Sequence, residues 1–281
     1  MQRFVRPSFF HHTQTHSLPN TTQSSGMPSI TKKLLPAILC IATLLIASCD
    51  RNSITSSQSS DNDKSTSDSS SLRVAILPIR ECDILQYACE SGLASDMGLD
   101  LELIPYDALM DIDTAILTDV AHVYFEDSLR ISRIKTDSIR PIMLLPVPVE
   151  LKLVANKDKE IKDIHGLKTN MVALTRWSQL EEWMTYMTGA ASMEQTDIYH
   201  AQINSLPVRF NMANGGLIDA AILPQPWADS LLNLGHANLC DTILDGMGFF
   251  ISPSAHGDSY RQRQAQLLRK VYLEAIKKQS K

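Results

Sequence analysis

The sequence predicts an α/β fold built from two similar lobes joined by a crossing segment. Short apolar runs typical of strands alternate with helical patterns, a rhythm that predicts parallel or mixed sheets with helices on their faces. The rhythm is interrupted around Pro146 and Pro148, in a stretch too long for one average strand, and then begins again. We therefore predict lobe 1 from residues 72–148 plus 248–281 and lobe 2 from residues 149–247.

Lobe 1 is expected to open with a strand followed by a helix. Asp83 is a candidate N-cap of that helix, and Gly92 stands where the helix should stop. The predicted strands lie at 72–79, 99–105 and 121–125, with a short helix at 111–117.

Lobe 2 repeats the rhythm with clearer helix signals. Ser178 and Glu181 have capping-box spacing at the start of a helix that Gly189 should end. Pro207 and Pro226 start two further helices. Strands are predicted at 170–174, 198–203 and 217–223, a return crossing at 248–252 and a final amphipathic helix at 261–278.

The segment from Met27 has the order of parts of an export signal. Two lysines precede an apolar run over 34–47, which as a helix would rise only about 21 Å against the roughly 30 Å of a bilayer core. The run ends in Ile-Ala-Ser-Cys49, which resembles the lipobox of bacterial lipoproteins. We therefore predict a signal peptide at 27–48 and lipidation of Cys49; the alternative is an uncleaved anchor helix.

Two further segments flank the signal. Residues 1–26 precede a signal that is complete without them, so we interpret them as a non-native upstream extension. Residues 49–71 are rich in Ser, Thr, Asn and Asp and carry almost no apolar side chains, which predicts a disordered tether.

Charge and motif content narrow the function classes. The first 48 residues hold four basic and no acidic residues, so the remainder has 22 basic against 31 acidic side chains, an acidic balance that argues against nucleic-acid binding, which needs a basic face. No metal-site cysteine spacing, nucleophile elbow or phosphate loop is present, so we predict no enzyme activity, no metal and no cofactor. Cys82, Cys89 and Cys240 remain in the domain, and a disulfide is not favoured.

Two stretches resemble the substrate-binding proteins of ABC importers in the nitrate, sulfonate, taurine and thiamine-precursor group. Residues 72–103 (LRVAILP, then ESGLASDMGLDLEL) resemble the opening strand and helix of that family. Residues 203–228 (INSLPVRFNMANGGLIDAAILPQPWA) resemble its Asn-Ser-x-Pro and Gly-x-x-Asp-Ala-Ala-x-Leu-Pro-x-Pro pattern, and 171–178 (MVALTRWS) its second-lobe opening. The similarity spans nearly all of residues 72–281.

The resemblance implies a periplasmic binding protein type II fold with a hinge and an interlobe cleft that closes on a small-molecule solute. It further implies a monomer, lipid-anchored in the cell envelope and facing the periplasm or the outer face of the cell membrane. Its partners would be an ABC permease and its ATPase.

Two departures keep other functions open. The family's acidic residue near the third strand is replaced around Ala121, and the chain ends at Lys281, before several helices that relatives carry. The alternatives are an exported lipoprotein that acts as a sensor or scaffold, and an enzyme like the thiamine-pyrimidine or menaquinone-pathway relatives of this architecture.

Candidate ligand contacts follow from the rule that such folds bind at the carboxyl ends of strands and between lobes. The loop before the Ser178 helix offers N–H groups, but two glutamates already complement that helix terminus, which favours a neutral or zwitterionic group there. Ser178 itself is interpreted as a cap, and one of the three residues that end the third strand is expected to face the cleft. The candidate residues are Arg80, Asp83, Tyr124, Glu126 (or Asp127 beside it), Thr175, Arg176, Trp177 and Gln225.

Overall fold

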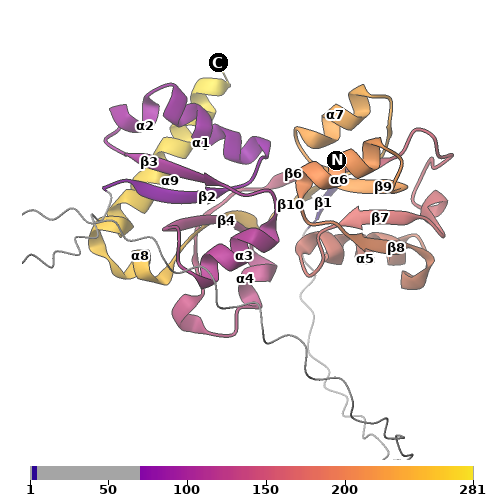
Figure 1. Cartoon of the computed structure of the whole chain (residues 1–281), viewed down its shortest axis with the longest axis horizontal. Coiled ribbons are helices and arrows are strands. Elements are labelled where there is room, and N and C mark those ends of the chain that lie inside the picture. The colour runs from indigo at the N-terminus through magenta and orange to yellow at the C-terminus, as the bar shows by residue number, and fades with distance from the viewer. Residues whose placement is uncertain (1, 5–69, 281) are drawn as a thin grey trace, which may run out of the picture. The chain divides into compact units, whose positions relative to one another are not determined.

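The computed structural model describes residues 2–4 and 70–280, in two sheets that belong to one compact unit of the chain (Figure 1). The predicted signal peptide at 27–48, the predicted lipidation site Cys49 and nearly all of the predicted tether at 49–71 lie outside the described residues. Within the part of the chain that the structure describes, no helix is long and apolar enough to cross a membrane.

Lobe 1 is a five-stranded mixed sheet in the order β3-β2-β4-β11-β5. The first three strands are parallel, and β11 runs antiparallel between β4 and β5. Its strands are β2 (Leu72–Ile76), β3 (Leu101–Pro105), β4 (Val123–Asp127), β5 (Ile142–Pro146) and β11 (Met247–Ile251). Its helices are α1 (Arg80–Glu90), α2 (Leu93–Asp96), α3 (Leu109–Leu117), α4 (Ser128–Ser132), α8 (Pro253–Gly257) and α9 (Ser259–Gln279), with a 3₁₀ turn at Asp137–Ile139.

Lobe 2 is a sheet in the order β1-β10-β6-β9-β7-β8. Strands β9, β7 and β8 are parallel, and β6 is antiparallel to both β9 and β10. Its strands are β1 (Gln2–Phe4), β6 (Val149–Ala155), β7 (Met171–Leu174), β8 (Tyr199–Gln202), β9 (Ala220–Pro224) and β10 (Ala237–Leu244). Its helices are α5 (Gln179–Ala190), α6 (Leu206–Asn214) and α7 (Trp227–Asn233). Short 3₁₀ turns lie at His165–Leu167 and Gln195–Asp197.

The chain passes between the lobes twice. The first passage, from β5 to β6, is the Pro146–Pro148 segment that the sequence indicated. The second runs from β10 to β11 through Asp245 and Gly246. Gly248, just beyond, lies so close to the backbone of Leu145 that an added Cβ would collide with its carbonyl oxygen. These two passages form the hinge.

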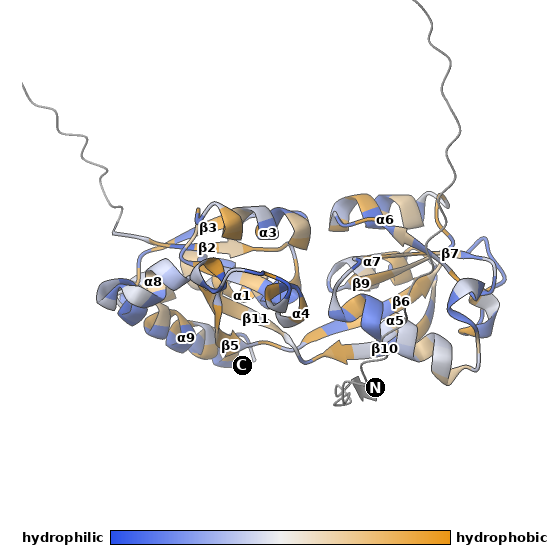
Figure 2. Cartoon of the chain, turned by 90° about the horizontal axis from the view of Figure 1, so that it is seen from below, coloured by the Kyte–Doolittle hydropathy of each residue, from blue (hydrophilic) through white to orange (hydrophobic). Residues whose placement is uncertain are grey.

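The apolar interior of each lobe lies between its sheet and its helices (Figure 2). In lobe 1, the Phe249 ring packs edge-on against Phe125 and Tyr272, at centroid distances of 5.1 and 5.3 Å. Tyr272 belongs to α9, which returns at the end of the chain and packs along α1. Burial of these aromatic rings holds α9 against the sheet.

Most predicted elements are confirmed, with shifts of a few residues at their ends. The sequence analysis did not predict strands β1 and β10 or the short helices α2, α4 and α8. Asp83 is not a cap, because α1 begins at Arg80 with Ile79 as its N-cap. The capping box at Ser178 is also wrong, because the Ser178 hydroxyl donates to the Thr175 carbonyl (2.7 Å), while Glu181 accepts from the Trp177 N–H (2.6 Å).

Candidate functional site

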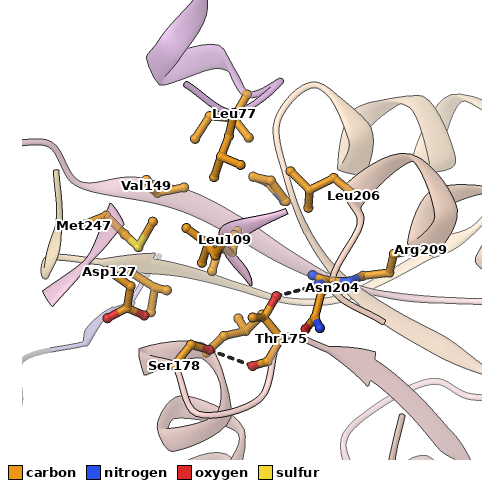
Figure 3. A pocket seen from close by; sticks show the side chains of 15 residues that line it. Leu77, Leu109, Asp127, Val149, Thr175, Ser178, Asn204, Leu206, Arg209 and Met247 are labelled. Carbon is orange, nitrogen blue, oxygen red and sulfur yellow. Dashed lines mark hydrogen bonds between the residues drawn. The ribbon is translucent and has the colours of Figure 1, made fainter. Parts of the chain in front are cut away.

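A cavity of about 60 Å³ lies between the lobes, several times the space that one water needs (Figure 3). Both lobes line it, and apolar side chains dominate. The apolar lining comprises Leu77, Ile79, Leu109, Val149, Leu151, Leu180, Leu206, Pro224, Leu244 and Met247. The polar lining comprises Asp127, Thr175, Ser178, Asn204 and Arg209. We call this space the interlobe cavity.

Arg209 supplies a positive charge at one side of the interlobe cavity. It is 1% exposed, on the buried face of α6. Its guanidinium donates to the carbonyls of Ile203 and Ile222 (both 2.8 Å) and to Thr175 Oγ1 (2.6 Å). Three of its five N–H groups are therefore used, and no ion pair to Arg209 is formed within the described residues. Desolvation lowers the pKa of Arg209 to about 9, which still leaves it charged at neutral pH.

Asn204 lies beside Arg209 at the same side of the cavity (Figure 3). Its Oδ1 is buried and has no hydrogen-bond partner among the described residues. A buried amide oxygen without a partner is costly, so it is suited to accept a hydrogen bond from a bound molecule. Arg209 and Asn204 together offer two unused N–H groups and one acceptor.

Asp127 supplies the opposite charge across the cavity from Arg209 (Figure 3). It caps α4 in lobe 1 by accepting from the Leu129 N–H (2.7 Å). It also accepts from the backbone N–H of Gln179 (2.7 Å) and from its Nε2 (2.9 Å), at the start of α5 in lobe 2. Burial raises the pKa of Asp127 more than these hydrogen bonds lower it. One carboxylate therefore caps two helices from two lobes.

Other hydrogen bonds also join the lobes directly. The Arg80 N–H donates to the Gln225 carbonyl (2.9 Å), and the Leu206 N–H to the Asp107 carbonyl (2.9 Å). The Trp227 indole donates to the Pro78 carbonyl (2.7 Å). These bonds, with those of Asp127, hold the two lobes against each other around the cavity.

The candidates at the end of the third strand separate clearly. Asp127 faces the cavity, but Tyr124 and Glu126 do not line it. Tyr124 is fully buried, where its hydroxyl donates to the Ala115 carbonyl and accepts from the Ala121 N–H. Glu126 is also fully buried, and its Oε1 lies 3.6 Å from Nε of Arg130.

The three candidates in the loop before α5 lie in different surroundings. Thr175 lines the interlobe cavity and bonds Arg209. Arg176 instead pairs with Glu181 (2.9 Å), which leaves its side chain outside the cavity. Trp177 is 57% exposed, has a φ of +57° and lines a different cavity.

The remaining candidates, Arg80, Gln225 and Asp83, do not line the interlobe cavity. Arg80 is exposed and forms ion pairs with Glu150 (3.7 Å) and Asp229 (3.4 Å). Gln225 is buried, and its side chain bonds Asp229 (2.6 Å) rather than the cavity. Asp83 is exposed on α1.

Sequence reasoning missed Arg209 and Asn204. A signal was available for Arg209, because it stands three residues after Leu206 and four before Ala213, the two other buried positions of α6. No comparable signal marks Asn204. Among the described residues, no group of His, Cys, Asp and Glu side chains could hold a metal ion, and Cys82, Cys89 and Cys240 are free thiols.

Solved structures share this two-lobe arrangement. The alkanesulfonate-binding protein SsuA from Xanthomonas axonopodis pv. citri, bound to MOPS, aligns at 13% identity over 74% of this chain and 73% of its own, with a TM-score of 0.59. The nitrate-binding protein NrtA from Synechocystis PCC 6803 aligns at 14% identity over 74% of this chain and 61% of its own, with a TM-score of 0.62. This chain has the fold of a periplasmic binding protein.

PhnD1 from Prochlorococcus marinus, in complex with methylphosphonate, aligns at 17% identity over 72% of this chain and 83% of its own, with a TM-score of 0.54. No model of a known protein family matches the chain, and no curated protein does. Identities this low establish the fold alone.

Proposed function

We propose that this protein is a solute-binding lipoprotein that captures a small anion between its lobes and delivers it to an ABC import permease. The observation that carries the proposal is the buried Arg209 in the interlobe cavity, which forms no ion pair within the described residues. A buried cation without an acidic partner carries a desolvation cost that a bound anion would offset. Solute-binding proteins for alkanesulfonate and nitrate, and PhnD1 with methylphosphonate, have the same fold and support this class of solute.

The negative group of the solute would sit at the two unused N–H groups of Arg209, not at the start of α5. The first free N–H of α5 is already taken by Asp127, so this helix terminus offers little to a second anion. The apolar lining limits the rest of the solute to a compact apolar body. The size of the cavity excludes a large ligand without further opening of the hinge.

The test is thermal unfolding of the full chain against nitrate and short sulfonates, phosphonates and carboxylates, with neutral and cationic small molecules tested alongside. At one hundred times its dissociation constant a ligand stabilises the fold by about 2.7 kcal/mol, roughly 5–11 °C in the unfolding midpoint of a domain of this size. A shift from one of these anions supports the proposal. A midpoint that moves only with neutral or cationic solutes would refute it.

Asn204→Asp sharpens this test. It places a carboxylate beside Arg209, where it would compete with a bound anion, so the ligand-induced shift should disappear while the fold persists. Asn211→Asp is the matched control, because Asn211 is exposed on α6, the helix that carries Arg209, and lines no part of the cavity. The control should respond to the anion as the unaltered chain does.

The lipid anchor requires its own measurement. Expressed in a bacterium supplied with labelled palmitate, the chain should incorporate label and partition into the membrane fraction. Cys49→Ser should abolish both, while Cys40→Ser, within the apolar run, should change neither. Label that persists in Cys49→Ser would contradict the proposed site.

A sensor or scaffold is the second candidate function, favoured by the direct hydrogen bonds between the lobes. Asp127 of lobe 1 and Gln179 of lobe 2 join the two lobes directly. A receptor whose closure reports another signal would keep the same radius of gyration in solution with and without every anion tested. A transport receptor would become more compact with its solute.

A further inference from the structure

A second cavity, of about 430 Å³, opens beside α3 and the segment that follows α4. It shares no lining residue with the interlobe cavity. Its volume lies within the range of small-molecule sites, unlike that of the smaller interlobe cavity. We call it the Trp177 pocket, after the side chain that lobe 2 contributes to it. Its apolar walls are Leu117, Ile134, Ile139 and Trp177, and two of its cations are Arg133 and Lys135.

The loop that carries Trp177 is fixed on both sides. The backbone N–H of Trp177 donates to the Glu181 carboxylate (2.6 Å). The carbonyl of Arg176, just before it, accepts from the Arg130 guanidinium (3.0 Å). The φ of +57° is one that a tryptophan rarely adopts, and yet the indole stays 57% exposed. An unfavourable backbone conformation that presents a large aromatic ring to solvent is typical of a binding surface.

The charges of the pocket leave two cations unneutralised. Arg130, at its inner wall, is engaged by Asp113 and Glu126. Arg133 and Lys135 are exposed and form no ion pair within the described residues. A positive surface of this kind stands out on a chain whose formal net charge is −5.

We propose that the Trp177 pocket binds a flat aromatic anion. The ring would stack on the Trp177 indole and against Leu117, which is 61% exposed and would be covered by the bound molecule. A carboxylate, sulfonate or phosphate on that ring would pair with Arg133 and Lys135. The ring requires the aromatic wall, and the negative group requires the two cations, so neither feature alone should give binding.

The experiment is isothermal titration of the full chain with three probes. 2-Naphthoate has both features, 2-naphthamide lacks the charge and cyclohexanecarboxylate lacks the aromatic ring. Naphthoate should bind at least about tenfold more tightly than either of the others. Equal binding of naphthoate and naphthamide, or of naphthoate and cyclohexanecarboxylate, would overturn the proposal.

Variants locate the bound probe. Trp177→Ala, and the double variant Arg133→Glu with Lys135→Glu, should each weaken naphthoate binding about tenfold or more, whereas Trp177→Phe should keep most of it. Lys162→Glu is the control for charge reversal, because Lys162 is an exposed lysine of lobe 2 that lines neither cavity. This variant should leave naphthoate binding unchanged. If Asn204→Asp abolishes naphthoate binding while Trp177→Ala does not, the probe occupies the interlobe cavity and the proposal is wrong.

Discussion

At the scale of single residues, the buried side chains of Arg209 and Asp127 carry opposite charges at the interlobe cavity. The sequence predicted the positions of these two residues to different extents. The helical spacing of Leu206, Arg209 and Ala213 places Arg209 on the packed side of α6, so its burial was accessible. The hydrogen-bond partners of Arg209 could not be predicted from the sequence, because the carbonyls of Ile203 and Ile222 reach its guanidinium only once α6 and β9 pack together. Asp127 was among the residues expected near the cleft, but its contact with Gln179 depends on how the lobes close.

Arg209→Met tests the structural part played by the guanidinium. The substitution keeps the apolar stem and leaves two buried carbonyls and the Thr175 hydroxyl without their donor. We expect the free energy of unfolding in urea to fall by about 3 kcal/mol. Lys270→Met, on the exposed face of α9, should change it by less than about 0.5 kcal/mol. An equal effect of both substitutions would contradict the structure.

The buried carboxylates beside Arg130 predict an unusual dependence of stability on pH. Burial raises the pKa of Glu126 well above its ordinary value, with the charge of Asp113 adding to the rise and Arg130 opposing it. An acid whose folded-state pKa is raised binds its proton more readily in the folded state. Its contribution to stability therefore grows as the pH falls through the folded pKa, and it is complete only below the unfolded value of about 4.3.

Glu126→Gln isolates this contribution. The amide cannot ionise, so the variant should gain stability relative to the unaltered chain at pH 8, and the gain should shrink steadily as the pH falls toward 5. Urea unfolding at successive pH values measures it. Glu160→Gln, at an exposed position, should give a difference that stays flat across the same range. A gain for Glu126→Gln that does not shrink on acidification would contradict the expected sign.

At the scale of elements, the sequence predicted the strands flanked by clear turn signals and missed β10. The run of Ala237–Leu244 contains Asp241 in mid-strand and a register shift between Asn238 and Cys240, so apolar alternation is weak. Pairing with β6, which is distant in the sequence, makes this segment a strand. Lys152 on β6 supports the pairing through its ion pair with Asp241 (2.9 Å).

The close packing of β11 on β5 at the hinge gives an element-level prediction. Gly248→Ala would push a Cβ into the Leu145 carbonyl and the Pro146 backbone, neither of which can yield without moving β5. We expect a loss of about 2 kcal/mol in the free energy of unfolding. Gly189→Ala is the matched control, because it meets open space near the end of α5 and should stabilise that helix by up to about 1 kcal/mol. If Gly248→Ala and Gly189→Ala moved the thermal unfolding midpoint in the same direction, the close approach of Gly248 to the Leu145 carbonyl would be refuted.

At the scale of the whole molecule, the sequence predicted the two-lobe fold but not the closed contact between the lobes. The strand–helix rhythm and its interruption near Pro146 are local patterns, readable from the chain. Closure depends on contacts such as Asp127 with Gln179, and on an apolar lining drawn from both lobes, whose members are far apart in the sequence. No periodicity encodes such contacts.

Gly246→Ala should open the lobes without altering either interior. An added Cβ at this position in the second passage would displace the amide of Gln179, which donates to Asp127. We expect a larger radius of gyration in small-angle X-ray scattering, with little change in the unfolding midpoint. Gly257→Ala, where the Cβ would meet nothing, should leave the scattering unchanged. Scattering of the Gly246→Ala variant that matched the unaltered chain would show that Asp127 and Gln179 do not hold the closure.

The position of β11 between β4 and β5 in lobe 1 sets the order in which the protein can form as it emerges from the ribosome. Strands β6 to β10 of lobe 2 are complete once residue 244 has appeared. The sheet of lobe 1 still lacks the strand between β4 and β5 at that moment, although all its other strands were made earlier. Lobe 1 must therefore keep apolar strand faces exposed while lobe 2 is synthesised, and that interval is when a chaperone or a protease would find this chain.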